Sequence, residues 1–422
     1  MLNSLKKTLL QYSRQLRISG KWILLAVTVG TILGFVGTAF FLLMTKATAL
    51  RLSHPWLLYF LPAGGLLIAW LYHVMRDDKD AGTNLVLSAV HSDEKLPPQM
   101  APLIFICTLI THLFGGSAGR EGAALQIGGS IANTIGELVH LDEKDRNLLI
   151  MCGMSAGFSA IFGTPMAATV FAIEVISVGI MQYAALVPCA ISALLAHGIA
   201  SHFLDQTLPL TVTQVPSFTV TTALYTALMA VICGIVSIIF CILLHESEAL
   251  YKRIFPNVYL RIAAGGCAVI ALTLLFGTRD YNGISLQLLA RCFAGTAVPG
   301  AFALKLILTV ATLGAGYKGG EIVPSMIIGA ALGSTFAGVL GLSPSLCAAV
   351  GLGSMFCAVT NCPIASLLIC FELFGLRGLP YYLLAIALSY ALSGYYGLYS
   401  SQKIAYSKYK AEYINRKTRD LE

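Results

Sequence analysis

Long apolar stretches alternate with short polar segments along most of the chain. Such stretches approach the roughly 20 residues that an α-helix needs to cross the hydrocarbon core of a bilayer. Because backbone amides cannot bond to water there, repeated apolar segments of this length indicate helices. The pattern therefore predicts an all-α polytopic membrane protein. The clearest stretches occupy residues 22–45, 56–74, 190–203, 224–244, 262–276 and 303–316.

The composition agrees with a surface that faces lipid. Of the 422 residues, 57% are hydrophobic and 11% are charged, and the mean hydropathy is +0.79. Soluble domains carry roughly 25% charged residues, because a solvated surface needs them. Most cysteines sit singly within apolar stretches, without the Cys/His spacing of a zinc site. We therefore expect the lipid bilayer as the main partner, with no metal and no cofactor.

Basic residues gather at the two ends of the chain. Residues 1–20 hold four basic residues and no acid, and residues 401–422 hold six basic residues against three acids. By the positive-inside rule, these ends are a cytoplasmic amphipathic helix and a basic cytoplasmic tail. The net charge of +7 is thus a topology signal, and we expect a multi-pass protein of the bacterial inner membrane. Nucleic-acid binding is a poor explanation, because the basic residues flank membrane segments.

The two halves of the chain repeat one another. Residues 157–174 can be laid on residues 353–372, and in both copies a proline precedes a glutamate by nine positions. Carried upstream, the same alignment places Gly119 on Gly320. We therefore expect a first membrane repeat at 21–205 and a second at 206–400.

A glycine-rich break interrupts each repeat at the matching place, at 115–122 and 314–324. A glycine-rich segment that leads into a helix leaves free N–H groups at the helix start, and the helix dipole makes that start attractive to an anion. Transporters built from repeats bind substrate where the repeats meet. Plain loops between spans are the alternative, which two breaks in register disfavour.

Glu121 lies in the first break. An ionisable residue within a bilayer costs roughly 2.5–3.5 kcal/mol, so it persists mainly where it has a function or a partner. A carboxylate is itself an anion, so Glu121 can occupy the donors that a transported anion uses and leave them when protonated. That competition couples anion movement to proton movement. A structural salt bridge with Arg120 is the alternative, which we expect to be disfavoured because adjacent helical residues do not face each other.

Other polar residues near the breaks have weaker signals. Thr83 and Asn84 precede a short apolar helix and offer further donors. Glu321, in the second break, either passes a proton onward or caps the helix that follows. Glu174 and Glu372 lie at equivalent helix ends, which favours structural roles for both.

Two patterns admit a second explanation. Residues 153–157 fit the G-x-S-x-G esterase pattern around Ser155, but no strand precedes them, so close helix packing explains them better. We therefore expect no enzyme activity. His112 precedes the first break; a position near Glu121 is one interpretation, but we expect it in a loop.

These motifs resemble the CLC family of chloride channels and anion/proton antiporters, over almost the whole chain. The resemblance rests on Gly-Arg-Glu-Gly at 119–122, the glycines before Pro324, and Phe-Glu-Leu at 371–373. It implies an inverted-repeat architecture of short, broken and tilted helices, and a homodimer with one pathway in each subunit. It also implies Glu121 for gating and proton coupling and Glu321 for proton transfer. The anion-binding residues that the same reasoning gives are Thr83, Asn84, Gly119, Arg120, Gly122, Gly320, Ile322, Val323 and Tyr399.

Within the family, the chain resembles the bacterial fluoride-exporting branch, through Gln126 after the first motif and Glu321 after the second. Val175 stands where conventional chloride antiporters carry an inner glutamate. Two residues depart from the fluoride branch. Thr83 replaces an asparagine or methionine, and its hydroxyl is closer to the serine of the chloride type. Val323 replaces a threonine, which removes an inner fluoride contact.

The choice among three nearby tyrosines stays open, since Tyr395 and Tyr396 compete with Tyr399 for the place near the central site. The expected function is exchange of a halide, fluoride or chloride, for protons, with fluoride favoured. A passive voltage-gated-type chloride channel of the same fold is the alternative. A membrane-embedded hydrolase or a scaffold is disfavoured, because a scaffold has little reason to keep two acids in apolar breaks.

Overall fold

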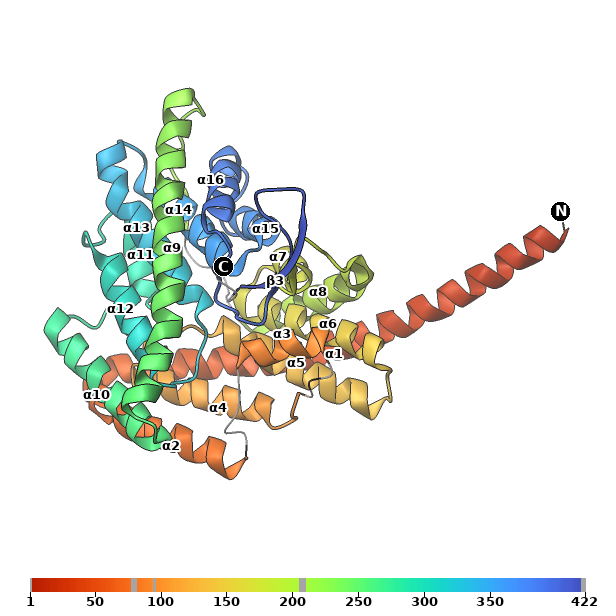
Figure 1. Ribbon diagram of the computed structural model, residues 1–422, viewed down its shortest axis with the longest axis horizontal. Helices are drawn as coiled ribbons and strands as arrows, with labels where there is room; N and C mark the ends of the chain where they lie inside the picture. The colour runs from red at the N-terminus through yellow and green to blue at the C-terminus, as the bar shows by residue number, and fades with distance from the viewer. Residues whose placement is uncertain (1, 77–81, 93, 95, 205–209, 419–422) are drawn as a thin grey trace.

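The computed structural model describes residues 2–76, 82–92, 94, 96–204 and 210–418, and it shows a helical protein (Figure 1). The expected boundary between the repeats, at 205/206, lies outside the described residues. Within them the strands are short: β1 (Ser177–Val178), β2 (Lys403–Tyr406) and β3 (Tyr413–Lys417). The all-α class is confirmed.

The α-helices form two series in chain order. The first comprises α1 (Leu2–Ser53), α2 (Leu61–Val74), α3 (Thr83–His91), α4 (Met100–Leu113), α5 (Glu121–Leu138), α6 (Glu143–Phe162), α7 (Pro165–Glu174) and α8 (Leu186–Phe203). The second comprises α9 (Val220–Ile254), α10 (Val258–Phe276), α11 (Leu286–Ala294), α12 (Ala301–Gly314), α13 (Ile322–Leu340), α14 (Pro344–Thr360), α15 (Pro363–Phe374) and α16 (Leu379–Leu392). Short 3-10 helices, η1 (Pro55–Phe60) and η2 (Tyr183–Ala185), precede α2 and α8.

The two series pack in the same way. Helix α5 lies against α4 and α6 as α13 lies against α12 and α14, and α1 packs on α8 as α9 packs on α16. Equivalent helices also meet, α2 with α10 and α7 with α15, and Figure 1 shows α2 beside α10 at one end of the molecule. The helices therefore repeat in both their order and their neighbours.

Among the described residues, six helical segments are long and apolar enough to cross a membrane: Gln15–Ser53, Pro55–Val74, Tyr183–Phe203, Val220–Ile254, Val258–Phe276 and Ile322–Leu340. Five of them contain apolar runs that the sequence predicts. The run at 303–316 belongs instead to α12, which has 14 residues and ends at the second break. The sequence run is continuous there because glycine and alanine, which end the helix, are not polar.

Paired glycines let neighbouring helices touch in each series. A Cβ at Gly128 of α5 would lie 2.1 Å from the carbonyl oxygen of Gly153 in α6. In the second series, a Cβ at Gly329 of α13 would lie 2.2 Å from the carbonyl oxygen of Gly351 in α14. Small residues permit this close approach in membrane proteins. Ser155 lies within α6, away from the sharp turn that an esterase nucleophile needs, so helix packing explains this pattern.

Two glutamates exchange helix caps across the middle of the molecule. Glu174 of α7 accepts hydrogen bonds from the N–H groups of Ile364 and Ala365 at the start of α15, at 3.1 and 2.8 Å. Glu372 of α15 accepts two such bonds from the start of α7, at 2.9 and 2.8 Å. Each carboxylate satisfies free N–H groups and lies at the positive end of a helix dipole. The structural role expected for both glutamates is confirmed.

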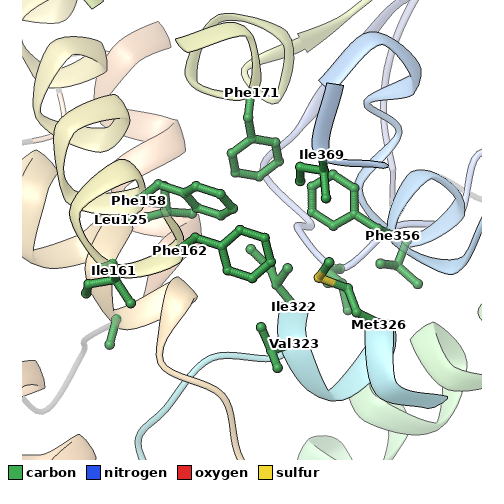
Figure 2. Close-up of a cluster of buried hydrophobic side chains, with 14 of the residues drawn as sticks. Leu125, Phe158, Ile161, Phe162, Phe171, Ile322, Val323, Met326, Phe356 and Ile369 are labelled. Carbon is green, nitrogen blue, oxygen red and sulfur yellow. The ribbon is translucent and has the colours of Figure 1, made fainter. Parts of the chain in front are cut away.

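Apolar side chains fill the centre between the two series (Figure 2). Phe171 of α7 lies 5.2 Å from Phe158 of α6 and 5.5 Å from Phe356 of α14, between ring centroids. Aromatic pairs of this kind add about 0.5–1.5 kcal/mol beyond their buried area. Ile322 and Val323 of α13 belong to the same cluster, so it fixes the start of that helix.

The start of the chain differs from the expectation. Residues 1–20 are not a separate helix, because α1 runs unbroken from Leu2 to Ser53 and its start projects from the body in Figure 1. No proline interrupts it, and Gly20 costs a helix only about 1 kcal/mol. The described part of the tail is folded, since β2 pairs in parallel with β1 and antiparallel with β3.

Removing one of the exchanged caps is expected to destabilise the protein. Glu372→Ala leaves N–H groups at the start of α7 without an acceptor, which costs about 1–3 kcal/mol. The thermal unfolding midpoint in detergent should fall. Glu137→Ala is the control, because Glu137 is an exposed glutamate near the end of α5. Equal midpoints for the two variants would contradict the capping role.

Candidate anion site between the two repeats

The two glycine-rich breaks pair with each other. The Gly119 N–H donates to the Gly320 oxygen at 2.6 Å, and the Gly320 N–H donates to the Gly119 oxygen at 2.8 Å. The bridge is antiparallel, so the equivalent segments run in opposite directions, as an inverted repeat requires. Only glycine fits here, because a Cβ at Gly320 would lie 2.6 Å from the Gly122 nitrogen. The alignment of Gly119 on Gly320 is confirmed, and it brings the starts of α5 and α13 together.

Glu121 is the first residue of α5 and is 1% exposed. Its Oε2 accepts a hydrogen bond from the Arg120 backbone N–H at 3.0 Å. The carboxylate therefore occupies a donor at the helix start, where an anion would bind.

The expectation that Arg120 and Glu121 do not face each other was wrong. The Arg120 Nε lies 3.4 Å from the Glu121 Oε1. Arg120 precedes the helix, with φ −122° and ψ −15°, so the rule for adjacent helical residues does not apply to this pair. The guanidinium also lies over the Phe41 ring, 4.1 Å from its centroid. The ion pair and the gating role are compatible, because the pair holds Glu121 at the helix start.

Two cavities approach the paired breaks. The Glu121 cavity has a volume of about 270 Å³, and Phe41, Arg120, Glu121, Phe162 and Val323 are among its lining residues. The Glu321 cavity has a volume of about 350 Å³, and Thr83, Asn84, Gln126, Lys318 and Glu321 are among its lining residues. Gly122 and Gly320 make the close contact at the breaks. The two acids of the breaks therefore line different cavities.

Thr83 and Glu321 converge on Gly122. A Cβ at Gly122 would lie 3.4 Å from the Glu321 Oε2 and 3.5 Å from the Thr83 Oγ1. The Gln126 Nε2 donates to the Thr83 Oγ1 at 3.1 Å, so the Thr83 hydroxyl keeps its own proton for another acceptor. Sequence reasoning named Gln126 only as part of a motif. Its position four residues after Gly122, on the same face of α5, was the signal for this role.

Glu321 precedes α13 at the N-cap position, but its side chain makes no capping hydrogen bond. The capping alternative is therefore wrong. The buried Tyr399 hydroxyl lies beside the Glu321 carboxylate and lacks a hydrogen-bond partner of good geometry. Tyr395 instead bonds to Ser407 at 2.8 Å, and Tyr396 lines a separate cavity beside α9. Of the three tyrosines, Tyr399 thus lies nearest the breaks.

The remaining candidate anion-binding residues lie near the breaks but differ in their contacts. The Asn84 Oδ1 accepts a bond from the Ser401 N–H at 3.1 Å, which ties Asn84 to the tail. Ile322 is fully buried, and its side chain belongs to the central apolar cluster. Val323 lines the Glu121 cavity, although it follows Glu321 closely in the sequence.

His112 supports the first break. It lies in α4 and is fully buried, so the loop position expected for it was wrong. Its Nε2 lies 3.2 Å from the Gly119 oxygen. The carbonyl that pairs with Gly320 therefore has a second contact, from His112.

Comparison with known proteins gives the family. The family described as voltage gated chloride channel matches residues 64–394, which include both breaks and the helices that follow them. The chain belongs to the voltage-gated chloride channel family. The resemblance to the CLC family that the motifs indicated is confirmed.

Two relatives span most of the chain. A chloride/fluoride channel protein of Pseudomonas syringae pv. tomato is 32% identical over 396 residues, which cover 92% of this chain and 88% of the relative. The H(+)/Cl(-) exchange transporter ClcA of Vibrio parahaemolyticus is 24% identical over 396 residues, covering 83% of this chain and 81% of the relative.

Solved structures of the family agree with the fold. A CLC-type fluoride/proton antiporter superposes with a TM-score of 0.87 at 35% identity, covering 91% of this chain and 98% of the other. A slow cyanobacterial Cl−/H+ antiporter superposes with a TM-score of 0.77 at 18% identity, covering 88% and 94%, and supports the fold alone. The inverted-repeat helical architecture is confirmed.

The Thr83–Gln126 bond predicts coupled effects on halide binding. Thr83→Val and Gln126→Leu should each weaken binding, and the double variant should lose less than the sum of the two. We expect a coupling energy of about 0.5–1.5 kcal/mol, because the two changes remove one hydrogen bond. Calorimetric titration of the detergent-solubilised protein with sodium fluoride measures it. Additive losses would show that Gln126 does not act through Thr83.

Proposed function

We propose that the protein exchanges fluoride for protons across the bacterial inner membrane, with Glu121 as the gate. One observation carries the proposal. The Glu121 carboxylate takes the Arg120 N–H at the start of α5, next to the constriction where Gly119 and Gly320 pair. A halide needs the same donors, so the carboxylate and the halide exclude each other.

Protonation switches this competition. A charged carboxylate is attracted by the helix start and by the Arg120 guanidinium. A neutral carboxyl group loses both attractions, leaves the helix start and admits the anion. Since each departure of Glu121 needs a proton, anion movement and proton movement are coupled.

Glu321 is the proposed second proton carrier. It lines the Glu321 cavity, and its Oε2 lies close to Gly122, the residue that follows Glu121 in α5. Tyr399 lies beside it. A proton released from Glu121 thus has an acceptor in the direction of the Glu321 cavity, which is the role the family resemblance gives to Glu321.

Fluoride is the anion we favour. It is strongly hydrated, so a site must replace its water with hydrogen-bond donors. The hydroxyl groups of Thr83 and Tyr399 offer two such donors near the breaks. Two relatives support the choice, one named as a chloride/fluoride channel protein and one as a fluoride/proton antiporter. Chloride is the alternative, because Thr83 departs from the fluoride branch and Val323 gives the Glu121 cavity an apolar wall.

The proposed orientation has both termini in the cytoplasm. Lys21 and Arg51 lie on the same unbroken helix, about 45 Å apart at 1.5 Å per residue, which matches a bilayer with its headgroups. The Glu321 cavity then faces the cytoplasm, and Lys252, Arg261 and Lys318 among its lining residues agree with the positive-inside rule. We also propose a homodimer with one pathway in each subunit, as the family resemblance implies.

Coupled exchange predicts a proton flux. Proteoliposomes loaded with fluoride should take up protons as fluoride leaves, in a fixed ratio to the fluoride released. A fluoride electrode and a pH electrode measure the two fluxes side by side, and a chloride-loaded sample compares the anions. Fluoride efflux without proton uptake would replace the antiporter with the passive channel.

Replacing the gate should remove the coupling. Glu121→Gln mimics the protonated side chain, so fluoride efflux should continue while proton uptake falls to the background of empty liposomes. Glu137→Gln makes the same change at the exposed end of α5 and should leave the ratio of the fluxes unchanged. If Glu121→Gln still moves protons at the wild-type ratio, Glu121 is not the proton carrier.

A further inference from the structure

A third cavity adjoins the Glu121 cavity. It has a volume of about 280 Å³ and lies between the end of α1 and residues 279–287. We name it the arginine antechamber, after the three arginines in its lining, Arg51, Arg120 and Arg279. Thr45 and Arg120 line both cavities, so the two spaces are neighbours.

The charges in the antechamber are unbalanced. Of the described residues that line it, Asp280 is the acid, and it pairs with Arg291 outside the cavity. Arg120 pairs with Glu121. Arg51 and Arg279 lie close enough to repel each other, and the buried Arg51 Nε has no hydrogen-bond partner. Two neighbouring cations without an acid between them attract an anion.

The walls of the antechamber are held in place. Arg51 lies over Gly283, where a Cβ would come within 2.8 Å of the Arg51 Nη2. The Asn282 Nδ2 donates to the Gly115 oxygen at 2.8 Å, which ties this wall to the first break. The fully buried Lys305 donates to the Gly283 oxygen at 2.8 Å from the other side. The arginines therefore project from a fixed frame rather than from a loose loop.

The volume of the antechamber and the unpaired oxygen of Asn282 indicate how hydrated the bound anion is. A water molecule takes about 30 Å³, so the cavity has room for a small anion with part of its hydration shell. Asn282 is 3% exposed, and its Oδ1 has no partner. That oxygen cannot bind an anion directly, but it accepts a hydrogen bond from a water that hydrates one.

We propose that the arginine antechamber is an anion-binding site, which holds a partly hydrated halide between Arg51 and Arg279 before it enters the Glu121 cavity. The site is separate from the helix start that Glu121 occupies. Its role in halide supply rests on the proposed exchange function, in which this cavity faces outward. It raises the local halide concentration in front of the gate, and salt that carries no halide weakens the effect by screening.

Side-specific transport tests the site. Right-side-out and inverted membrane vesicles present the two faces separately, and the half-saturating fluoride concentration is measured on each at low ionic strength. For Arg279→Gln we expect it to rise about fivefold on the outer face and to stay unchanged on the inner face. Potassium gluconate should reduce the difference. Unchanged values on the outer face, or equal rises on both faces, would overturn the proposal.

A matched control lies on the same helix as Arg51. Lys46 is an exposed cation five residues earlier in α1 and does not line the antechamber. Lys46→Gln removes the same charge and should leave both half-saturating concentrations at the wild-type value. A rise equal to that of Arg279→Gln would assign the effect to general surface charge and overturn the site.

Direct binding separates this proposal from the exchange function. Sodium fluoride is titrated into detergent-solubilised wild type and the Arg51→Gln/Arg279→Gln variant, and the number of bound ions per chain is compared. The wild type should bind one ion more, whether or not it moves protons. If the numbers are equal while exchange is intact, the site fails and the function stands. If exchange is absent and the extra ion remains, the function fails and the site stands.

Discussion

The two hydrogen bonds between Gly119 and Gly320 are the constraint on which the site depends. Inside a bilayer, every backbone N–H and C=O group needs a partner from the protein, and irregular backbone is tolerated only where it is buried or lines a cavity. Each break supplies the other with its partners. The pairing leaves the N–H groups at the start of α5 free for a carboxylate or an anion. A side chain at Gly320 would collide with Gly122, so the two breaks approach each other closely where they satisfy each other's backbone groups.

The helices around the breaks are arranged almost symmetrically, but the charged residues in the two breaks differ. Glu174 and Glu372 cap each other's partner helices. In the breaks, however, Arg120 corresponds to Glu321, and Glu121 corresponds to an isoleucine, so the acids are displaced by one position. Successive residues at a helix start point about 100° apart. Glu121 consequently lines the Glu121 cavity and Glu321 lines the Glu321 cavity, so the two sides of the symmetric scaffold differ chemically.

Positive charge follows the proposed anion path from one end to the other. Arg51 and Arg279 line the antechamber, and Arg120 faces both this space and the gate. On the far side, the lining of the Glu321 cavity includes Arg261 and Lys318. Glu121 and Glu321 are the acids placed against the breaks themselves. An anion is thus attracted toward the breaks from both sides, and at the breaks it competes with a carboxylate for the same donors.

The helical class, the alignment of the repeats and the choice of Glu121 as the candidate gate followed from the sequence alone. These conclusions rest on local features that can be recognised in the sequence: the length of apolar runs, the shared Pro-to-Glu spacing and a charge in an apolar break. Which residues meet became visible in the fold: Gln126 with Thr83, Tyr399 rather than Tyr395 with Glu321, and Arg120 with Glu121. These contacts join segments far apart in the chain or depend on the backbone angles at one helix start. Periodicity carries no information about either, because it records which residues avoid water and not which side chains face each other.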